Sequence, residues 1–480
     1  MEKHRIFVTV KNEPGILAKV SQLFGQCGLN IDALTVDANK EVRTSKMKIT
    51  LQSEPPLIEH VIQQLSSLAD VLQVNVAQHA ARSSLSAVLS KRGVAFWLVA
   101  YSLFITLLGT NIPSPLLALY RAQWHLSVGM VTLLFASYAI VVIPTIILSG
   151  QLSDQIGRKK LLIPGVFFTV VGSLLFAFST NFALLLVSRI FQGISVGMLN
   201  GVAVAALTEL DPKQNRIKAA FVGSMAVTVG NALGPVLSGL LGEYAPFPMK
   251  LAYFVHMFLA IPGFLGLFYM REKGRRPEAI RMHRPAVPRE IFGRFYLSGI
   301  TSFIAWSLMS LMLSIIPSYT EQLVGSANLA VAGAIVALVL SVSTISQMIL
   351  KNLPLQRLSI VGFAVILLGL VSLIVTLETK SLVFLFLTTL LIGFGHGPTF
   401  AGSLALTNHI SPDASRGDII ASFYVVTYLG VSLPILGLGF AASWVGLNNA
   451  VCIYIALMMV LILISMYFWI VDARKAQTDN

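Results

Sequence analysis

The residue with the clearest chemical consequence is Arg189, because it stands inside a long apolar run of the chain. A charged side chain at the centre of a membrane helix costs at least ~2.5 kcal/mol, so such residues mark ion or substrate pathways by default. Gln192 and Gly193 follow at a spacing that places Gln192 about one helical turn away. Two interpretations are open: Arg189 is functional, or it packs structurally by bonding backbone carbonyls or by reaching the membrane interface.

A second group of charges lies in the segment 150–160, which reads GQLSDQIGRKK and separates two apolar runs. Its one acid, Asp154, is followed by three consecutive cations that begin at Arg158. Two membrane-length helices joined by so few residues must be antiparallel neighbours. We expect a tight turn in which Gly150 and Gly157 supply the backbone freedom. The cations predict a cytoplasmic turn, and the simpler interpretation is an anchor that only orients the helices.

Polar and aromatic side chains within other apolar runs are candidates for lining a pocket. They are Asn111, Asn231, Trp306, His396, Tyr424 and Tyr428. His396 could titrate near neutral pH, and the small residues around it predict open space. For each candidate, ordinary interhelical hydrogen bonding or a place in an interface belt is at least as good an interpretation. No Asp or Glu falls at the middle of an expected helix, which favours neutral, zwitterionic or anionic solutes over strongly cationic ones.

The composition indicates that most of the chain lies in a membrane. Of its 480 residues, 55% are hydrophobic and 11% are charged, whereas about 25% of the residues of a soluble protein are charged. Twelve apolar segments are long enough to cross ~30 Å of hydrocarbon, where helices satisfy the backbone. These predicted helices span 94–110, 128–149, 161–179, 182–207, 219–241, 251–270, 296–316, 329–350, 358–377, 382–406, 419–440 and 450–471.

The net charge of +13 is unevenly distributed. Residues 1–80 hold 8 Lys+Arg and 8 Asp+Glu, whereas residues 81–480 hold 26 and 13. With the N-terminal region in the cytoplasm, the inside segments hold 22 Lys+Arg and the outside loops hold 3. The charge therefore orients the helices, with both termini in the cytoplasm, and it does not indicate a nucleic acid partner.

The domain boundaries follow from these changes in composition. The segment 271–295 carries eight basic residues and divides the helices six and six. We expect it to be an exposed linker that orients and tethers the halves; binding of anionic lipid headgroups is the second interpretation. The predicted domains are a head domain at 1–80, a linker at 81–93, helical halves at 94–270 and 296–471 separated by the basic linker, and a cytoplasmic tail at 472–480.

Several classes of chemistry receive no support from the sequence. Cys27 and Cys452 lie far apart in different kinds of segment, so we predict neither a disulfide nor a metal site. We find no Ser/His/Asp set and no phosphate-cradling loop in a suitable context, so we expect neither an enzyme nor a cofactor. The first long apolar run begins near Val94, so we expect no signal peptide.

The head domain has the alternating and helical spacings of a small α+β fold. We expect Pro14 in the first turn of its first helix and Gly28 at the end of that helix. A second helix starts at Pro55. Strands are predicted at 6–10, 29–36, 45–51 and 71–76. The order βαββαβ predicts a ferredoxin-like domain.

With these features together, segment 150–160 resembles the signature loop between helices 2 and 3 of the major facilitator superfamily. The spacing Arg189-x-x-Gln192-Gly193 resembles the helix 4 motif of that family, which is linked there to proton coupling. The resemblance implies an all-α membrane fold of two six-helix bundles. It also implies a substrate site at mid-membrane between the bundles and a mechanism of alternating access.

The fifth predicted helix contains Gly230, Gly234 and Pro235, and this spacing resembles the family motif associated with exporters. Ser238 stands where that motif has a glycine. Close helix packing by small residues and a proline kink explain the same spacing equally well.

The signature loop does not repeat in the second half, where the segment 350–357 lacks the Gly and Asp. We therefore expect a one-sided ionic latch that closes the cytoplasmic side. Asp154 and Arg158 would form it against Asp418, which stands at the start of the eleventh predicted helix.

The head domain resembles the ACT domain, most closely that of the small regulatory subunit of acetolactate synthase. The resemblance rests on the stretches 12–17 and 28–31 and implies a small amino acid bound at a dimer interface. The matching positions are Asn12, Gly15, Ile16, Leu17, Asn30 and Ile31. Free amides at a helix start attract a carboxylate. A domain that only dimerises, or a plain turn, are the other interpretations.

The sequence therefore predicts a secondary transporter in a bacterial-type cytoplasmic (inner) membrane that exports a small solute, with protons as the coupling ion. The head domain would sense an amino acid, for example a branched-chain one, and would pair with a second copy to form a homodimer. An uptake carrier with an inert head domain is one alternative. A membrane-tethered regulator of a biosynthetic enzyme is the other, and it predicts no need for Arg189 or Asp154.

Overall fold

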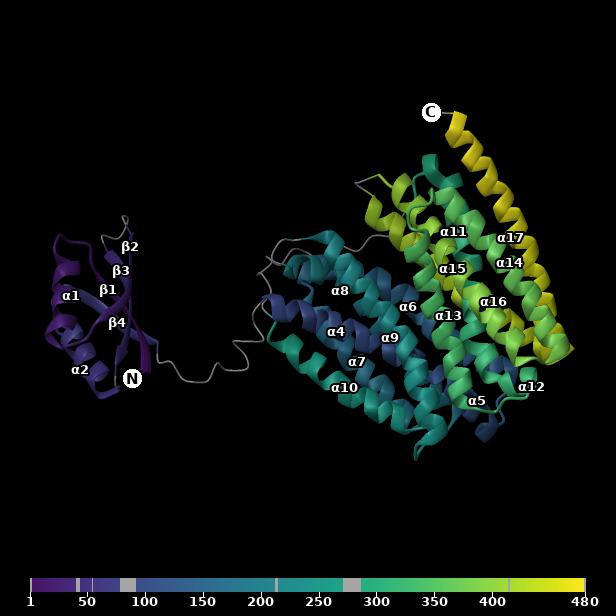
Figure 1. Ribbon diagram of the computed structural model, residues 1–480, viewed down its shortest axis with the longest axis horizontal. Helices are drawn as coiled ribbons and strands as arrows, with labels where there is room; N and C mark the ends of the chain where they lie inside the picture. Colours follow the sequence, from purple (N-terminus) through teal and green to yellow (C-terminus); the bar gives the residue numbers. More distant parts are fainter. Residues whose placement is uncertain are drawn as a thin grey trace. The chain divides into compact units, whose positions relative to one another are not determined.

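The computed structural model describes residues 2–39, 44–53, 55–77, 92–211, 215–270, 286–412 and 415–478. The chain divides into two compact units, Met1–Val88 and Leu89–Asn480. Figure 1 shows that all the labelled strands belong to the first unit and that the second is helical. Most of the two expected linkers, at 81–91 and 271–285, lies outside the described residues.

The head domain is a four-stranded antiparallel sheet with two helices, in the strand order β2-β3-β1-β4 (Figure 1). Alternate residues of the central strands, among them Ile6, Val8 and Ile49, are fully buried in the core that they share with the helices. The elements are β1 (Glu2–Lys11), α1 (Ile16–Gln26), β2 (Ile31–Asn39), β3 (Thr44–Ser53), α2 (Pro55–Ser66) and β4 (Val71–Ala77). The predicted ferredoxin-like order is confirmed.

The turn before α1 depends on glycine. Gly15 has φ +87°, a conformation in which a Cβ is strained, and it directly precedes the first helical residue, Ile16. Pro14 therefore lies in the turn, and the expectation that it stands in the first helical turn is wrong. Gly28, with φ +69°, follows the end of α1 as expected.

The second unit contains twelve helical segments that are long and apolar enough to cross a membrane, within the residues described. The prediction of a multi-pass helical membrane protein is confirmed. The elements are α4 (Arg92–Asn111), α5 (Pro113–Trp124), α6 (Val128–Ile156), α7 (Lys159–Ala177), α8 (Phe182–Leu210), α9 (Arg216–Tyr244), α10 (Leu251–Phe268), η1 (Arg289–Ile291), α11 (Phe292–Ser318), α12 (Thr320–Val324), α13 (Leu329–Leu350), α14 (Leu355–Thr379), α15 (Leu382–Ile410), α16 (Arg416–Val445) and α17 (Leu447–Thr478).

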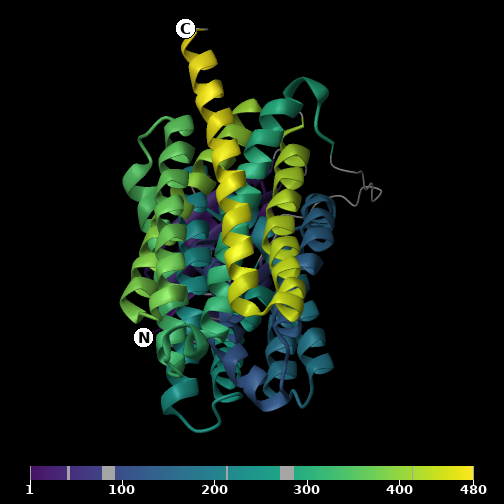
Figure 2. The same cartoon turned by 90° about the vertical axis from the view of Figure 1, so that its right-hand side faces the viewer.

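Several predicted boundaries differ from the structure. The first helix was expected to end at Thr110, but α5 continues it after a break and the combined span reaches Trp124. The last helix runs to Thr478, well into the expected tail, and Figure 2 shows its yellow end projecting beyond its neighbours. At the end of the basic linker, Ile291 lies in η1 and packs against a small core cluster around Phe423, so this part is not fully exposed.

The expected loop at 150–160 is mostly helix. Gly150 lies inside α6, which continues to Ile156, so its expected role in the turn is wrong. Only Gly157, with φ +105°, breaks the helix before α7 begins at Lys159. The reversal between two long helices is therefore made by Gly157 and Arg158 alone, which is the tight antiparallel turn expected.

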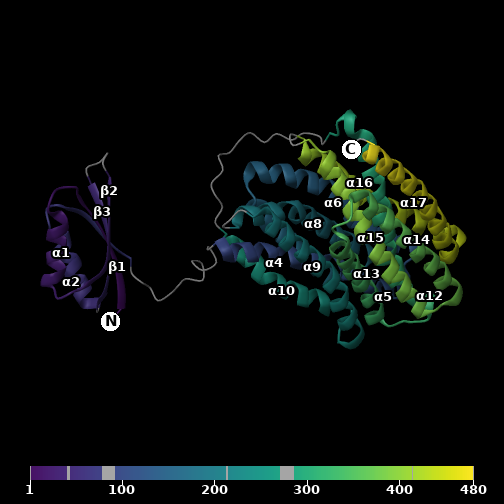
Figure 3. The ribbon, with the colours of Figure 1, turned by 45° about the horizontal axis from the view of Figure 1, so that its top comes forward.

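Glycines permit close contact within the first half, which comprises α4 to α10. A Cβ on Gly230 would clash with the backbone oxygen of Phe104 in α4, and a Cβ on Gly234 would clash with that of Leu108. The motif in α9 therefore packs that helix against α4, as its structural interpretation predicts. Figure 3 shows α4 and α10 side by side in this half, and α14 and α17 side by side in the second.

The two halves meet along α9 with α13 and along α6 with α16. Gly333 of α13 faces the carbonyl oxygen of Pro235, and a Cβ on Gly239 of α9 would lie 2.7 Å from the carbonyl oxygen of Leu329 in α13. Gly439 of α16 leaves room for Thr132 of α6 in the same way. These backbone approaches bring the halves together at one end of the unit.

The positive φ of Gly15 in the head domain gives a direct test. Gly15→Ala should lower the free energy of unfolding of the head domain by about 1 kcal/mol, because only glycine adopts this φ without strain. Gly25→Ala is the matched control, since Gly25 is helical with nothing within 4 Å of a Cβ, and it should be neutral or stabilise by up to about 1 kcal/mol. Urea unfolding of residues 1–80 measures both. Equal effects of the two substitutions would contradict the turn geometry.

Candidate functional site

A cavity of about 480 Å³ lies between the two halves of the membrane unit. Its lining comes from α4, α6, α8 and α9 of the first half and from α11, α13, α15 and α16 of the second. No Asp, Glu, Lys or Arg occurs among the described residues that line it. All six pocket candidates line this cavity: Asn111, Asn231, Trp306, His396, Tyr424 and Tyr428. The structure thus brings them together, and their part in substrate contact stays a prediction.

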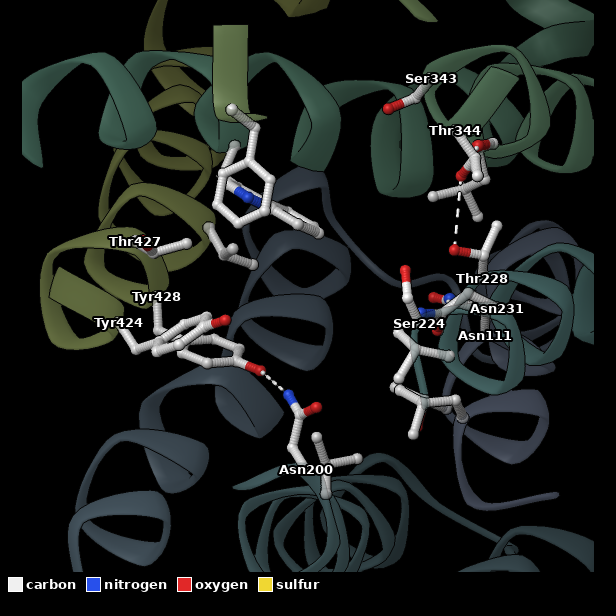
Figure 4. Close-up of a pocket in the computed structure, with 18 of the residues that line it drawn as sticks. Asn111, Asn200, Ser224, Thr228, Asn231, Ser343, Thr344, Tyr424, Thr427 and Tyr428 are labelled. Carbon is white, nitrogen blue, oxygen red and sulfur yellow. Dashed lines mark hydrogen bonds between the residues drawn. The ribbon is translucent and has the colours of Figure 1, made fainter. Parts of the chain in front are cut away.

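Polar bonds cross the cavity. Asn111 donates from its amide to Asn231 at 2.8 Å, which ties α4 to α9 within the first half. Asn200 donates to the Tyr428 hydroxyl at 3.4 Å, and this bond joins the two halves (Figure 4). Asn200 was not among the predicted site residues, although an amide inside an apolar helix is the same signal that found Asn111.

A second bond between the halves was also missed. Thr344 of α13 donates to Thr228 of α9 at 3.4 Å, as drawn in Figure 4. Ser343, beside Thr344, also lines the cavity. Threonine and serine commonly bond their own helix, so nothing in their spacing distinguishes these from other hydroxyls of the chain.

His396 and Trp306 form an aromatic group in the wall of the second half. The rings of His396 and Trp306 lie edge to face with centroids 5.1 Å apart, and Phe400 flanks both. His396 Nδ1 bonds the Ser343 hydroxyl at 2.8 Å. His396 Nε2 and Trp306 Nε1 are buried without a hydrogen-bond partner among the described residues.

The glycines beside His396 allow helices to pack closely and do not create open space around the ring. A Cβ on Gly393 would lie 2.7 Å from the carbonyl oxygen of Val339, and Gly397 lies still closer to that of Ser343. These glycines let α15 approach α13 closely, so the expectation that they leave room around the ring is wrong. They fix the position of the helix that carries His396.

The cavity is closed at one end. Ser114 of α5 donates to the carbonyl oxygen of Leu313 in α11 at 2.6 Å, and the Arg121 guanidinium lies 4.2 Å from the ring centroid of Tyr319. The Glu243 carboxylate accepts from the backbone N–H of Leu329 at 2.8 Å, at the start of α13, where a negative charge is favoured. All three contacts join the first half to the second.

The other end carries Arg158 and Lys351, and we call it the basic end. There Ala220 and Ser224 of α9 line the cavity and are exposed, whereas Leu313 at the closed end is only 3% exposed. The cavity therefore opens towards the basic end.

Arg189 and Gln192 lie behind the cavity wall. Arg189 is 1% exposed, and its Nη1 donates to the carbonyl oxygen of Thr110 and to the Gln192 side chain, both at 3.0 Å. Gln192 donates to the carbonyl oxygen of Gly109 at 3.0 Å. The guanidinium also lies 5.5 Å from the ring centroid of Tyr138. The contacts to carbonyls fit the structural interpretation of Arg189 and leave its role in proton coupling untested.

The break between α4 and α5 explains why a polar pair is needed here. Pro113 has no backbone N–H, so the carbonyl oxygen of Gly109, four residues earlier, lacks its helical donor. An unpaired carbonyl in a membrane interior costs free energy, and the Gln192 amide supplies the missing hydrogen. Gly109 also has to be glycine because a Cβ would meet the ring of His256.

At the basic end, Arg158 contacts the first half. Its Nε lies 3.3 Å from the Glu209 carboxylate of α8, and its Nη1 donates to Ser153. The Asp154 side chain lies outside what the structure describes, and an ion pair between Arg158 and Asp418 stays a prediction. Glu209 is a partner that the sequence did not suggest, because it lies 51 residues away.

In the head domain the ligand candidates surround the turn before α1. Asn12 accepts a hydrogen bond from Ser45 at 2.9 Å, so its side chain is held beside β3. Ile16 is buried and helps the core, whereas Leu17 is 42% exposed and Asn30 is exposed. Ile31 is half-buried at the start of β2.

An ion pair joins α1 to the residue that precedes β4. Lys19 donates to Asp70 at 2.8 Å, and this bond lowers the pKa of Asp70 below its usual value. Asp70 directly precedes β4, so α1 is tied to the sheet next to the candidate ligand turn.

The fold and cavity define a helical membrane protein of two packed halves around a central chamber. The sequence profile of the Major Facilitator Superfamily matches residues 99–434, and the chain belongs to this family. The profile of the AHAS small subunit-like ACT domain matches residues 6–73, which confirms the expected head domain.

Curated relatives match part of the chain. Multidrug resistance protein 1 of Bacillus subtilis is 27% identical over 191 residues, which cover 40% of this chain and 48% of the relative. The class H tetracycline resistance protein of Pasteurella multocida is 33% identical over 159 residues, 33% of this chain and 38% of the relative. The riboflavin transporter RibZ of Clostridioides difficile is 29% identical over 138 residues, 29% of this chain and 30% of the relative. The chain thus spans less than half of each.

Solved structures share the fold over most of the chain. A bacterial homologue of the human lysosomal transporter Spinster, inward-facing and unoccupied, covers 81% of this chain and 98% of its own, with a TM-score of 0.65 and 16% identity. A D-xylose–proton symporter covers 77% and 96%, with a TM-score of 0.61 and 15% identity.

The pairing of Gln192 with the Gly109 carbonyl can be tested. Gln192→Leu should lower the free energy of unfolding by about 1–3 kcal/mol, because it leaves a buried carbonyl and part of the Arg189 guanidinium unpaired. Gln123→Leu, at an exposed position of α5, should change it by less than about 0.5 kcal/mol. Unfolding in mixed micelles measures both. A loss of the same size in the two variants would refute the proposed role.

Proposed function

We propose that the protein is a secondary active transporter that exports a small solute by alternating access, with protons as the coupling ion. The observation that carries the proposal is the central cavity, which opens at the basic end and is closed at the other end by contacts between the halves. A cavity with one open end between two packed halves is the arrangement that rocking of the halves would invert.

The direction rests on charge and on relatives. The excess of Lys and Arg at the basic end favours the cytoplasm for that side, so the chamber would load from inside the cell. Relatives named for multidrug and tetracycline resistance favour export. The membrane is then a bacterial-type inner membrane with both termini inside.

The contacts at the two ends suggest what changes between states. With the basic end open, Arg158 bonds Glu209 and Ser153 of its own half. Closing that end would bring Asp154 and Arg158 to the start of α16, where Asp418 stands in the first turn. Opening the other end would break the Ser114 bond and separate Arg121 from Tyr319.

A transport assay tests the proposal. Inverted membrane vesicles with an acidic interior should accumulate tetracycline or riboflavin, and a protonophore should abolish the accumulation. Asp154→Asn should slow the flux about tenfold, which corresponds to about 1.4 kcal/mol of lost stabilisation of one state. Glu321→Gln, exposed at the opposite end, is the control and should keep the wild-type rate. Flux into right-side-out vesicles only would replace export with uptake.

The head domain is proposed to sense an amino acid and to bias the transporter. An effector acts only if it binds differently in two states of the protein. Asn12, held by Ser45, and the turn at Gly15 would receive the ligand, and a second copy of the head domain would complete the site.

Removal of the head domain tests this regulation. Valine, isoleucine or leucine should change the flux of the full chain by a factor of about 5 or more, the range typical of allosteric coupling. The same additions should have no effect on a chain that lacks residues 1–80. Asn12→Ala should lose the response, whereas Gln22→Ala, exposed on α1, should retain it. Identical responses with and without the head domain would show that it is inert.

A further inference from the structure

We propose that the Trp306 and His396 ring N–H groups form a donor pair that binds a hydrogen-bond acceptor oxygen of an aromatic substrate. This inference rests on the proposed function, because it names the substrate class of the same cavity. Trp306 Nε1 and His396 Nε2 are buried without a partner among the described residues, and both side chains line the cavity.

The tautomer of His396 follows from its one described bond. His396 Nδ1 lies 2.8 Å from the Ser343 hydroxyl, and no other acceptor for that hydroxyl is found among the described hydrogen bonds. We therefore assign the hydroxyl as the donor to Nδ1, and this assignment places the hydrogen of the neutral ring on Nε2. Trp306 Nε1 is a donor in any state. The pair thus offers two hydrogens and no lone pair.

Unpaired donors in this position call for a ligand. Burying a donor without an acceptor costs about 1–3 kcal/mol, so native proteins satisfy nearly all such groups. His396 is 3% exposed, and its ring is held by Ser343 on one side and by the Trp306 ring, 5.1 Å away, on the other. The donors are therefore held in place before a ligand arrives, which lowers the entropy that binding would otherwise lose.

The surroundings define the rest of the substrate. Phe400 lies 5.7 Å from Trp306 between ring centroids, and Tyr424 and Tyr428 also line the chamber. These aromatic side chains can pack against a flat aromatic ring of the substrate. Since no charged side chain lines the described cavity, an organic cation would be desolvated without a counter-charge or an acceptor, whereas the two N–H donors would give a carboxylate charge-assisted hydrogen bonds. The site therefore selects aromatic carbonyl or carboxylate compounds over aromatic amines.

Four indoles of similar size test this preference. They are indole-3-acetate, indole-3-acetamide, tryptamine and 3-methylindole, of which only the first two carry an acceptor oxygen. The full-length protein in detergent is assayed by equilibrium binding of radiolabelled indole-3-acetate, with the other three as competitors. Indole-3-acetamide should compete at least about tenfold better than tryptamine or 3-methylindole, as the loss of one hydrogen bond predicts.

Substitutions assign the preference to the two donors. Trp306→Phe keeps an aromatic ring and removes the N–H, and it should weaken indole-3-acetate binding about tenfold. His396→Ala should do the same, and His396→Gln, whose amide places an N–H near the position of Nε2, should recover part of the loss. Trp444→Phe and His409→Ala are matched controls at exposed positions of α16 and α15 and should bind like the wild type.

Three outcomes would overturn the inference. They are no saturable binding of indole-3-acetate, equal competition by all four indoles, or wild-type affinity in both Trp306→Phe and His396→Ala; the last would mean that the donors are satisfied by water only. Transport is measured separately with tetracycline or riboflavin. If tetracycline or riboflavin is transported but the indoles compete equally, only the proposed donor pair is refuted. If indole-3-acetate binds with the expected preference but none of these compounds is transported, only the proposed transport function is refuted.

Discussion

The structure depends on one constraint, which is that every backbone hydrogen-bonding group within hydrocarbon needs a partner inside the protein. Long helices satisfy these groups with their own backbone hydrogen bonds. At each break in a helix, another group of the protein has to supply the missing partner. At the break between α4 and α5, Pro113 frees the carbonyl oxygen of Gly109 and Gln192 supplies the donor. Arg189 holds Gln192 in place through its side-chain oxygen. Arg189 therefore helps, through Gln192, to satisfy the carbonyl oxygen that Pro113 leaves without a helical donor.

The hydrophobic effect does not drive helices together within a membrane. Close backbone packing, which small residues permit, therefore stabilises their association. Gly230 and Gly234 set α9 against α4, while Gly333 sets α13 against Pro235. Only the contact of Gly333 with Pro235, of these three, joins the two halves, and the cavity between the halves opens at the basic end.

Much of this architecture could be predicted from the sequence because hydrocarbon thickness fixes the length of each apolar run. The twelve spans and the order of the head domain follow from that rule and from strand alternation. The ends of the helices could not be predicted as well. A helix such as α17 continues beyond its apolar residues to Thr478, and hydrophobicity does not indicate where it ends. Gly150 was misplaced for a related reason: glycine is tolerated within a long helix, and only the φ of Gly157 identifies the turn.

The cavity was predictable in part for the same physical reason. Polar side chains in membrane helices face the interior of the bundle, so Asn111, Asn231 and His396 were candidates from type and position alone. Asn200 obeys the same rule and was overlooked. The pairing of Arg158 with Glu209 could not be predicted, because it joins residues that are distant in the chain and depends on how α6 packs against α8.

The position of Arg189 suggests how a charge outside the cavity could still affect it. The guanidinium bonds the carbonyl oxygen of Thr110, and the next residue, Asn111, holds Asn231 across the cavity wall. The cation and the chamber are therefore separated by one peptide unit of α4. The chamber itself carries no formal charge in the residues described, and His396 is the imidazole in its lining. The polar pair at the helix break cannot itself gain a proton, because a guanidinium stays charged and an amide does not titrate, but it holds the end of α4 that carries Asn111.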